Sequence, residues 1–473
     1  MTSSLRSRTL LTIVAMVVQG AVRLLYSILV GRFTSRELLG QTNTSLSTAV
    51  LASQLWAAPA GAAGTKYVAL RRAMDDEEGA KAVARHLALR TAVISVVLPT
   101  AVSVIGSRWL GLDDRQVIMT CVLAWAYSVY NTLRGIKFGE QQYGRVAVLD
   151  SVAAATGILV LAIVLVLDLR ALILLPLTLG YALFAALAWP RRTRARLDPA
   201  LRREVDTFVL LGVVSGVASG GLIQTSQLAA HAFGGDSGAG EYAAALTLAT
   251  PPSMLAIALS TVVIPPLVAA ATKGDHEGVR RSSDRLARQL TALFVGLFGS
   301  LVIVAPTLMG VYGSGFASSI GQLRVLLLAL MLTSISVAAN ATLTSTSTSG
   351  PWLVAGLNLA GLLASLATWP WLADAHGSLG VAYGVLIGSA IASAGSMAVV
   401  WHREHQQWWG LLGRIIVGVA LALALAAATR GVPGVGGVAL QGGATLLFLA
   451  TWALLNRSAV TMLTRTLLGR SQS

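Results

Sequence analysis

Three polar side chains inside the first apolar stretch of the chain, residues 9–31, could bind a ligand. Gln19 lies four residues before Arg23 and Tyr26 lies three residues after it, so all three share one face of a helix. An arginine in hydrocarbon costs about 2.5–3.5 kcal/mol even on the mild insertion scale, so it should face a cavity or a partner. The spacing predicts a polar stripe that could hold an anion and hydroxyl groups.

A second polar stripe lies in the apolar stretch over residues 207–231. Gln224, Gln227 and His231 repeat the same helical spacing, and Gly216 and Gly220 extend it with residues small enough for close helix packing. Two such helices suggest a hydrophilic cleft between two halves of the protein. The alternative is that the glutamines only bond neighbouring helices. We predict these substrate-binding residues: Arg23, Gln19, Tyr26, Gln224 and Gln227.

The composition predicts an all-α polytopic membrane protein. Of the 473 residues, 55% are hydrophobic and only 12% are charged, whereas soluble domains carry about 25% charged residues. Apolar runs of roughly twenty residues recur along the chain and predict about fourteen transmembrane helices. We place them at 9–31, 40–64, 87–107, 116–136, 146–167, 171–189, 207–231, 241–270, 289–311, 322–344, 350–372, 379–401, 411–430 and 435–456.

The basic residues predict the orientation of these spans. With the N-terminus inside, 27 of the 35 Lys and Arg residues fall on the inner side and seven on the outer side, with Arg23 within a span. The positive-inside rule therefore explains the net charge of +15 without nucleic acid, and it puts both termini in the cytoplasm. An arginine-rich stretch, 190–206, is predicted to be a cytoplasmic linker between two six-helix halves, 1–189 and 207–401. Residues 402–473 hold two appended helices and a cytoplasmic tail.

A local repeat relates the two halves. Residues 75–92 read DDEEGAKAVARHLALRTA, and residues 274–291 read GDHEGVRRSSDRLARQLT, at an offset of 199. Both segments follow the second span of their half, and the number of spans between them is even. The halves are therefore predicted to be parallel repeats, as in transporters whose substrate lies between two such halves.

No motif for catalysis is present in the sequence. It has no Walker, HExxH or GxSxG pattern, and Cys121 is its only cysteine. We therefore expect no catalytic residue, no metal site and no cofactor, and we predict that the protein is not an enzyme.

Two segments resemble a known family. Residues 240–267, GEYAAALTLATPPSMLAIALSTVVIPPL, are similar to the eighth span of the polysaccharide-transporter branch of the multidrug/oligosaccharidyl-lipid/polysaccharide flippase superfamily. Residues 358–384, NLAGLLASLATWPWLADAHGSLGVAYG, resemble the hairpin of its spans eleven and twelve, although the usual second asparagine is missing. Cavity arginines of the lipid II flippases have no match that we can assign residue by residue.

The resemblance implies a transporter of the bacterial cytoplasmic membrane. Its substrate would be an anionic polyprenyl-pyrophosphate-linked oligosaccharide or polysaccharide precursor, moved from the inner to the outer leaflet by alternating access. The implied partners are this lipid-linked glycan, membrane lipids and glycan-assembly enzymes, with no nucleic acid.

Three alternatives remain open at this point. A drug/cation antiporter of the same fold would need a deep carboxylate, and Asp150 and Glu241 lie near span ends. A membrane glycosyltransferase or polymerase would need a sizeable outer loop. A non-transporting membrane scaffold for cell-envelope synthesis would not need the paired polar stripes.

The predicted orientation can be tested with single cysteines in a Cys121→Ser background. Cysteines that replace Arg194 and Arg281 should be shielded from an impermeant thiol reagent in intact cells, because both lie in predicted inner segments. Cysteines that replace Gly235 and Ser314 should be labelled. Labelling at position 194 would overturn the orientation.

Overall fold

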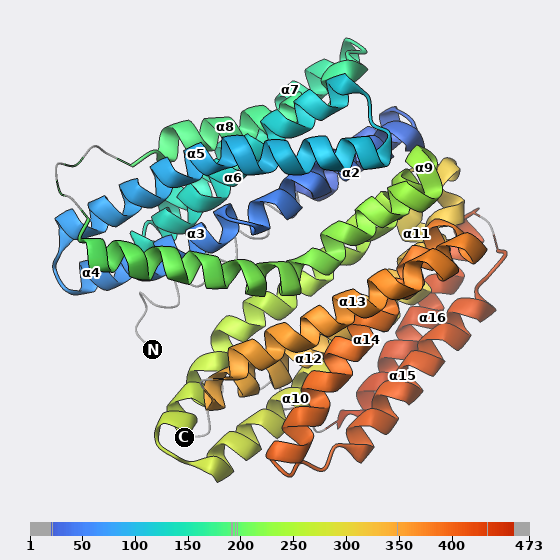
Figure 1. Cartoon of the computed structure of the whole chain (residues 1–473). Helices are drawn as coiled ribbons and strands as arrows, with labels where there is room; N and C mark the ends of the chain where they lie inside the picture. Colours follow the sequence, from blue (N-terminus) through green and yellow to red (C-terminus); the bar gives the residue numbers. More distant parts are fainter. Residues whose placement is uncertain are drawn as a thin grey trace. The chain divides into compact units, whose positions relative to one another are not determined.

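The computed structural model describes residues 20, 22–190, 193, 195, 197–347, 349–432 and 434–457, without the side chains of 107, 109, 257–266 and 268–270. The described residues form helices joined by short turns, and no strand occurs among them (Figure 1). The chain divides into two compact units, Met1–Ala243 and Ala244–Ser473. The predicted all-α class is confirmed.

The first unit contains residues 22–33, which are helical, and the elements that follow them up to the start of α9. Ser35 caps the helix that begins at Arg36. Hydrogen bonds from the Glu37 backbone amide and from Ser35 lower the pKa of the Glu37 carboxyl. The elements are α2 (Arg36–Gln54), α3 (Ala57–Ala63), a π-helical turn η1 (Gly64–Val68), α4 (Ala69–Ala73), α5 (Glu77–Leu110), α6 (Asp114–Gly139), α7 (Tyr143–Val166), η2 (Arg170–Leu172), α8 (Leu175–Ala188) and α9 (Pro199–Thr272).

The predicted second span is interrupted between α2 and α3. The helix leaves regular geometry at Leu55 and Trp56, because the ring of Pro59 would clash with the carbonyl group four residues earlier. Glycines then bring this segment into backbone contact with α6: a Cβ atom on Gly135 would lie 2.2 Å from the carbonyl oxygen of Gly61. The Thr65 hydroxyl donates to the Gly135 carbonyl over 2.9 Å. Such close packing of small residues holds helices together where lipid supplies no hydrophobic drive.

The long element α9 consists of two helical arms. The backbone leaves helical geometry at Gly235, with φ 61° and ψ −166°, between the predicted seventh and eighth spans. The Gln227 amide donates to the Ala239 carbonyl over 3.1 Å, so the chain reverses here. The beginning of the second arm contacts α2 backbone to backbone, since a Cβ atom on Gly240 would lie 1.9 Å from the carbonyl oxygen of Arg36.

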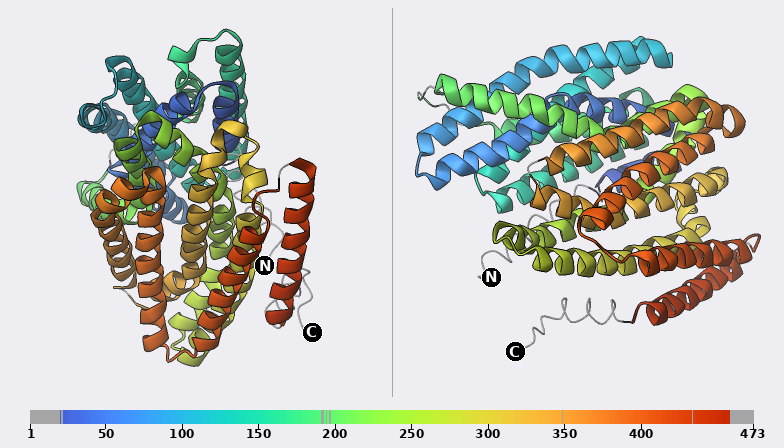
Figure 2. Two further views of the ribbon diagram at one scale, coloured as in Figure 1. Left: turned by 90° about the vertical axis from the view of Figure 1, so that its right-hand side faces the viewer. Right: turned by 60° about the horizontal axis from the view of Figure 1, so that its bottom comes forward.

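The second unit holds the remaining helices. They are α10 (His276–Ile303), α11 (Ala305–Met309), η3 (Ser314–Ser319), α12 (Ile320–Thr346), α13 (Gly350–His376), α14 (Ser378–Arg403), α15 (Trp409–Ala428) and α16 (Gly434–Leu455). Figure 2 shows α15 and α16 as a pair at one side of this unit, and both contact α10. The indole of Trp452 donates to the Ala292 carbonyl over 2.7 Å, and Gly299 makes room for Phe448. The two helices that the sequence analysis predicts as appended are therefore packed directly against α10.

The predicted repeat has the same local geometry in both copies. Asp76 accepts a hydrogen bond from the Gly79 amide over 2.8 Å at the start of α5, and Asp275 accepts one from the Gly278 amide over 2.8 Å at the start of α10. The preceding residues, Asp75 and Gly274, both have positive φ, at 57° and 69°. The offset of 199 therefore relates equivalent helix caps.

Ten described helices are long and apolar enough to cross a bilayer. Each of the fourteen predicted ranges also overlaps described helical residues, including 22–31 for the first range. The chain is a multi-pass membrane protein with the fold class that its hydropathy predicts.

The packing of α13 against α14 leads to a stability prediction. A Cβ atom on Gly388 would lie 2.3 Å from the Gly361 carbonyl oxygen and 2.1 Å from the Ser365 hydroxyl, whereas Gly356 has nothing within 4 Å. Gly388→Ala should therefore destabilise the protein by about 1–3 kcal/mol through overpacking. Gly356→Ala, on the same helix pair, should be neutral or slightly stabilising because alanine favours helix. Thermal unfolding in detergent measures both, and equal melting temperatures would contradict the packing argument.

Candidate functional site

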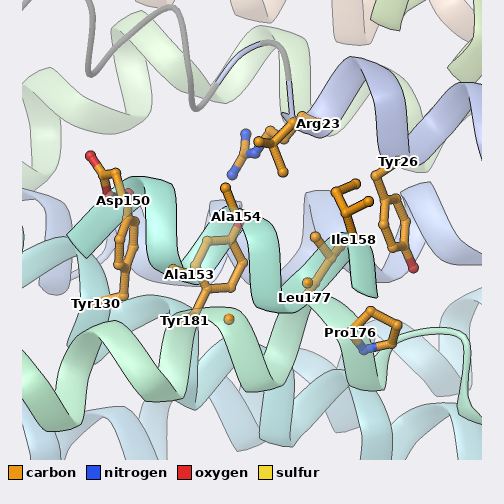
Figure 3. Close-up of a pocket in the computed structure, with 13 residues that line it drawn as sticks. Arg23, Tyr26, Tyr130, Asp150, Ala153, Ala154, Ile158, Pro176, Leu177 and Tyr181 are labelled. Atoms are coloured by element: carbon orange, nitrogen blue, oxygen red, sulfur yellow. Dashed lines mark hydrogen bonds between the residues drawn. The ribbon is translucent and has the colours of Figure 1, made fainter. Parts of the chain in front are cut away.

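The helix over residues 22–33 presents Arg23 and Tyr26 to a pocket inside the first unit. Helices α6, α7 and α8 supply its other walls, and Figure 3 shows Arg23 between Tyr26 on one side and Tyr130 with Asp150 on the other. Tyr26 is buried, and its hydroxyl donates to the Ile173 carbonyl, which fixes the ring. Arg23 and Tyr26, which the spacing places on one helix face, therefore line the same pocket. Its lining also includes Val22, Ala153, Ala154, Gly157, Ile158, Pro176, Leu177, Gly180 and Tyr181.

Aromatic rings surround the Arg23 side of this pocket. The guanidinium carbon of Arg23 lies 5.3 Å from the ring centroid of Tyr127, within cation–π range. The rings of Tyr127 and Tyr130 lie 5.1 Å and 4.9 Å from that of Tyr181, and Phe184 packs edge-on against Tyr130 at 4.7 Å. These contacts hold the cation among ring faces and hydroxyl-bearing side chains.

Asp150, one member of a buried ion pair, lies on the opposite wall of the pocket. Asp150, which is 5% exposed, accepts from the Tyr130 hydroxyl over 2.9 Å and pairs with the Arg134 guanidinium over 3.0 Å. The sequence places Asp150 near the end of the predicted span 146–167 and gives it no partner. The structure instead buries it together with Arg134. A complementary charge on each of two consecutive spans was the signal that could have paired them.

Arg23 differs from Arg134 because it forms no ion pair with a described carboxylate: Asp150 lines the same pocket but is paired with Arg134. Its Nε and Nη2 atoms are buried and have no hydrogen-bond acceptor among the residues that the structure describes. Asp150 is neutralised by Arg134, which lies outside the lining, so Arg23, Asp150 and Arg134 together carry one net positive charge. Buried donors without acceptors are rare in proteins and point to a ligand, an ion or water. The pocket suits an anion better than a cation.

The pocket is small. Its volume is about 40 Å³, which admits water molecules but no sugar. A larger ligand could reach Arg23 only if the surrounding helices moved apart.

The other predicted site residues lie elsewhere. Gln19 lies outside the described residues. Gln227 is 1% exposed and bonds the α9 turn, while its Oε1 has no partner among the described atoms; Gln224 is partly exposed. Neither glutamine lines the Arg23 pocket. On the same arm, Gly216 and Gly220 pack against Gln54 of α2, so part of this stripe serves helix packing. The substrate-binding role of all five residues stays a prediction.

The described residues contain no group of three or more His, Cys, Asp or Glu side chains that could hold a metal ion.

His231 lies beside the α9 turn, where its Nε2 is 2.8 Å from an Asp236 carboxylate oxygen. His231 is therefore partnered within the α9 turn.

Solved structures show which proteins share this fold. An inward-facing multidrug-resistance MATE transporter of the MOP superfamily aligns with a TM-score of 0.67 and 17% identity over 83% of this chain and 98% of its own. An outward-facing structure of such a transporter aligns at 0.61 and 14%, covering 84% and 95%. A MOP superfamily transporter from Pyrococcus furiosus, described as having a binding pocket of reversed polarity, aligns at 0.59 and 16%, covering 84% and 94%. No protein-family model and no curated protein sequence matches the chain.

The fold is therefore that of the MATE transporters of the MOP superfamily. The first unit carries a buried pocket lined by Arg23, two of whose donors lack acceptors among the described residues, and by Asp150, which is paired with Arg134.

The buried ion pair leads to a prediction about stability. Asp150→Asn leaves the Arg134 charge buried without its partner, so it should destabilise the protein by about 3–5 kcal/mol. The matched control is Asp168→Asn, because Asp168 pairs with Arg170 on the surface at 73% and 58% exposure. Loss of that pair should cost less than about 1 kcal/mol. Chemical or thermal unfolding in detergent compares the two. An Asp150 variant as stable as the control would contradict the pairing.

Proposed function

We propose that the protein is a membrane transporter that moves a polyprenyl-pyrophosphate-linked oligosaccharide or polysaccharide precursor from the inner to the outer leaflet. The observation that carries this proposal is the buried Arg23 guanidinium, which forms no ion pair and has two donors without acceptors among the described residues. A pyrophosphate supplies the anionic oxygens that such donors bind most strongly.

The fold supports a transporter of this kind. Proteins with the same fold have been solved in inward-facing and outward-facing conformations, which is the pair of states that alternating access needs. The reversed pocket polarity described for the Pyrococcus furiosus protein indicates that charge within this fold can differ between members. Alternating access by this chain is part of the proposal.

The membrane potential would assist export of an anion. A negative charge that leaves the negative interior gains about 2.3 kcal/mol per 100 mV if it crosses the whole field. A pyrophosphate head group carries more than one such charge, so an anionic substrate could move outward without ATP hydrolysis. The lipid tail would stay in the bilayer while the head group passes through the protein.

The second candidate is a drug/cation antiporter of the same fold. The observation in its favour is Asp150, a carboxylate buried beside Tyr130 in the pocket. Its pairing with Arg134 works against this function, because the neighbouring cation already neutralises the carboxylate that a cationic drug or a coupling proton would use. A non-transporting scaffold would predict no transport phenotype for any pocket variant.

A complementation experiment tests the proposal. Deletion of the gene should trap lipid-linked saccharide in the inner leaflet and reduce a surface glycan. Arg23→Ala should restore flipping at least about tenfold less well than the parent, since a hydrogen bond to a charged group is worth ~1.5–3 kcal/mol. Arg23→Lys keeps the charge without the planar fork and should restore part of the activity. Arg32→Ala, an exposed arginine on the same helix, is the matched control and should restore all of it.

The readout is the leaflet distribution of the lipid-linked sugar at matched protein levels. A distribution unchanged by deletion, together with accumulation of a cationic dye, would reject the flippase and favour the antiporter. Full activity of the Arg23→Ala variant would reject the role of Arg23.

A further inference from the structure

A second cavity in the first unit, of about 210 Å³, is separate from the Arg23 pocket and shares no lining residue with it. It lies among α2, the start of α6 and the segment from η2 to α8. Its interior is polar and buried on the α2 side, where Thr42 and Ser45 are each 1% exposed. Its rim is exposed and carries Asp113, Arg115 and Arg170.

The two arginines at the rim are available for a ligand. Arg115 has no acidic partner within ion-pair distance among the described residues. Arg170 pairs with Asp168 over 2.7 Å, but both side chains are more than half exposed, and such surface pairs are weak enough for a phosphate to compete. The Asp113 carboxylate accepts from the Gln116 backbone N–H over 2.6 Å as the cap of α6, so one of its oxygens is engaged.

The location of these arginines runs against the charge bias of the chain. Only seven of its 35 Lys and Arg residues fall in the predicted outer segments. Two of those seven, Arg115 and Arg170, line this one cavity. Basic residues are the ones that translocation disfavours, so their convergence at one opening needs a reason beyond membrane anchoring.

We propose that this cavity is an anion site on the outer face, for a phosphate ester flanked by hydroxyl groups. Arginine matches phosphate oxygens with its planar fork, and the side chains of Gln41, Gln116, Thr42 and Ser45 supply amides and hydroxyls suited to ligand hydroxyls. The volume is below the range of about 300–1,000 Å³ of drug-sized pockets, which fits one phosphorylated sugar or one lipid head group.

The site also touches the α9 turn through one residue. The Gln41 amide donates to the Asp236 carboxylate over 2.8 Å, and Gln41 lines the cavity at the same time. A ligand that forms a hydrogen bond with the Gln41 carboxamide oxygen would therefore contact the side chain whose NH2 group links α2 to the turn at Gly235 through Asp236. The proposal does not depend on the substrate proposed for Arg23.

Protection of a cysteine from labelling tests the site. The full chain with Met119→Cys in a Cys121→Ser background, in phosphatidylcholine nanodiscs, places a thiol in the lining. Glucose 1-phosphate should slow its modification by a thiol reagent, and glucose should not. Arg115→Gln combined with Arg170→Gln should weaken protection by glucose 1-phosphate about tenfold or more, equivalent to at least ~1.4 kcal/mol. Arg108→Gln, another predicted outer arginine outside the lining, should behave as the parent.

Two further arms identify the source of the ligand and the face of the membrane. In phosphatidylglycerol nanodiscs the thiol could be modified slowly even without added sugar. If the double substitution restores fast modification, the site binds a lipid head group. If modification in these nanodiscs is fast and glucose 1-phosphate still protects the thiol, the site binds a soluble phosphate ester.

In intact cells an impermeant reagent should reach the thiol. Absence of protection in both nanodiscs, protection that survives the double substitution, or a thiol inaccessible from outside would overturn the proposal. The single Arg115→Gln variant decides the result if the double variant does not fold. Each readout is binding, so a negative result leaves the flipping assay at Arg23 unaffected.

Discussion

The cost of a charge inside a helical bundle is the constraint on which the first unit depends. Arg134 meets this constraint through Asp150, which also takes a hydrogen bond from Tyr130, so both charges are compensated in place. Arg23 meets it only in part, through the Tyr127 ring face, since two of its donors lack acceptors among the described residues. A bundle of this kind retains an incompletely compensated cation at the expense of stability, and an intramembrane ionisable residue is by default a sign of function.

The surrounding lipid also determines how the helices pack against one another. Lipid tails are as apolar as leucine, so helices associate through close packing and polar contacts rather than through hydrophobic burial. Backbone-to-backbone contacts at Gly61 with Gly135 and at Gly361 with Gly388 occur in the first and second units respectively. Serine and threonine hydroxyls bond across these contacts, as Ser365 does to the Gly384 carbonyl over 2.8 Å. Small residues therefore position the walls within which the charged side chains lie.

The fold was largely predictable from the sequence, because hydropathy and charge act locally along the chain. The spans, the break at Gly235 and the repeated caps at Asp76 and Asp275 all follow from patterns within a few residues. The site was predictable only in part. The shared face of Arg23 and Tyr26 follows from helical spacing, but the Arg134–Asp150 pair joins two helices whose relative rotation no local pattern determines. For the same reason, spacing alone did not reveal that Gln227 bonds the α9 turn instead of lining the Arg23 pocket.

The small volume around Arg23 connects the site to motion. About 40 Å³ holds water but no head group, so the proposed substrate requires helices to separate. The first arm of α9 is held within its unit by polar contacts near both of its ends. Asp206 lies 3.1 Å from the His86 ring, and beyond the turn Asp236 accepts from Gln41 over 2.8 Å. The first contact is only slightly exposed, with 16% of the His86 side chain and 18% of the Asp206 side chain accessible, and Asp206 also pairs with Arg90. The Arg134–Asp150 pair is buried and cannot easily be exchanged. The pair therefore keeps its charges in place, and the proposed anion could reach Arg23 only if the helix over residues 22–33, α6, α7 and α8, which line the pocket, moved apart.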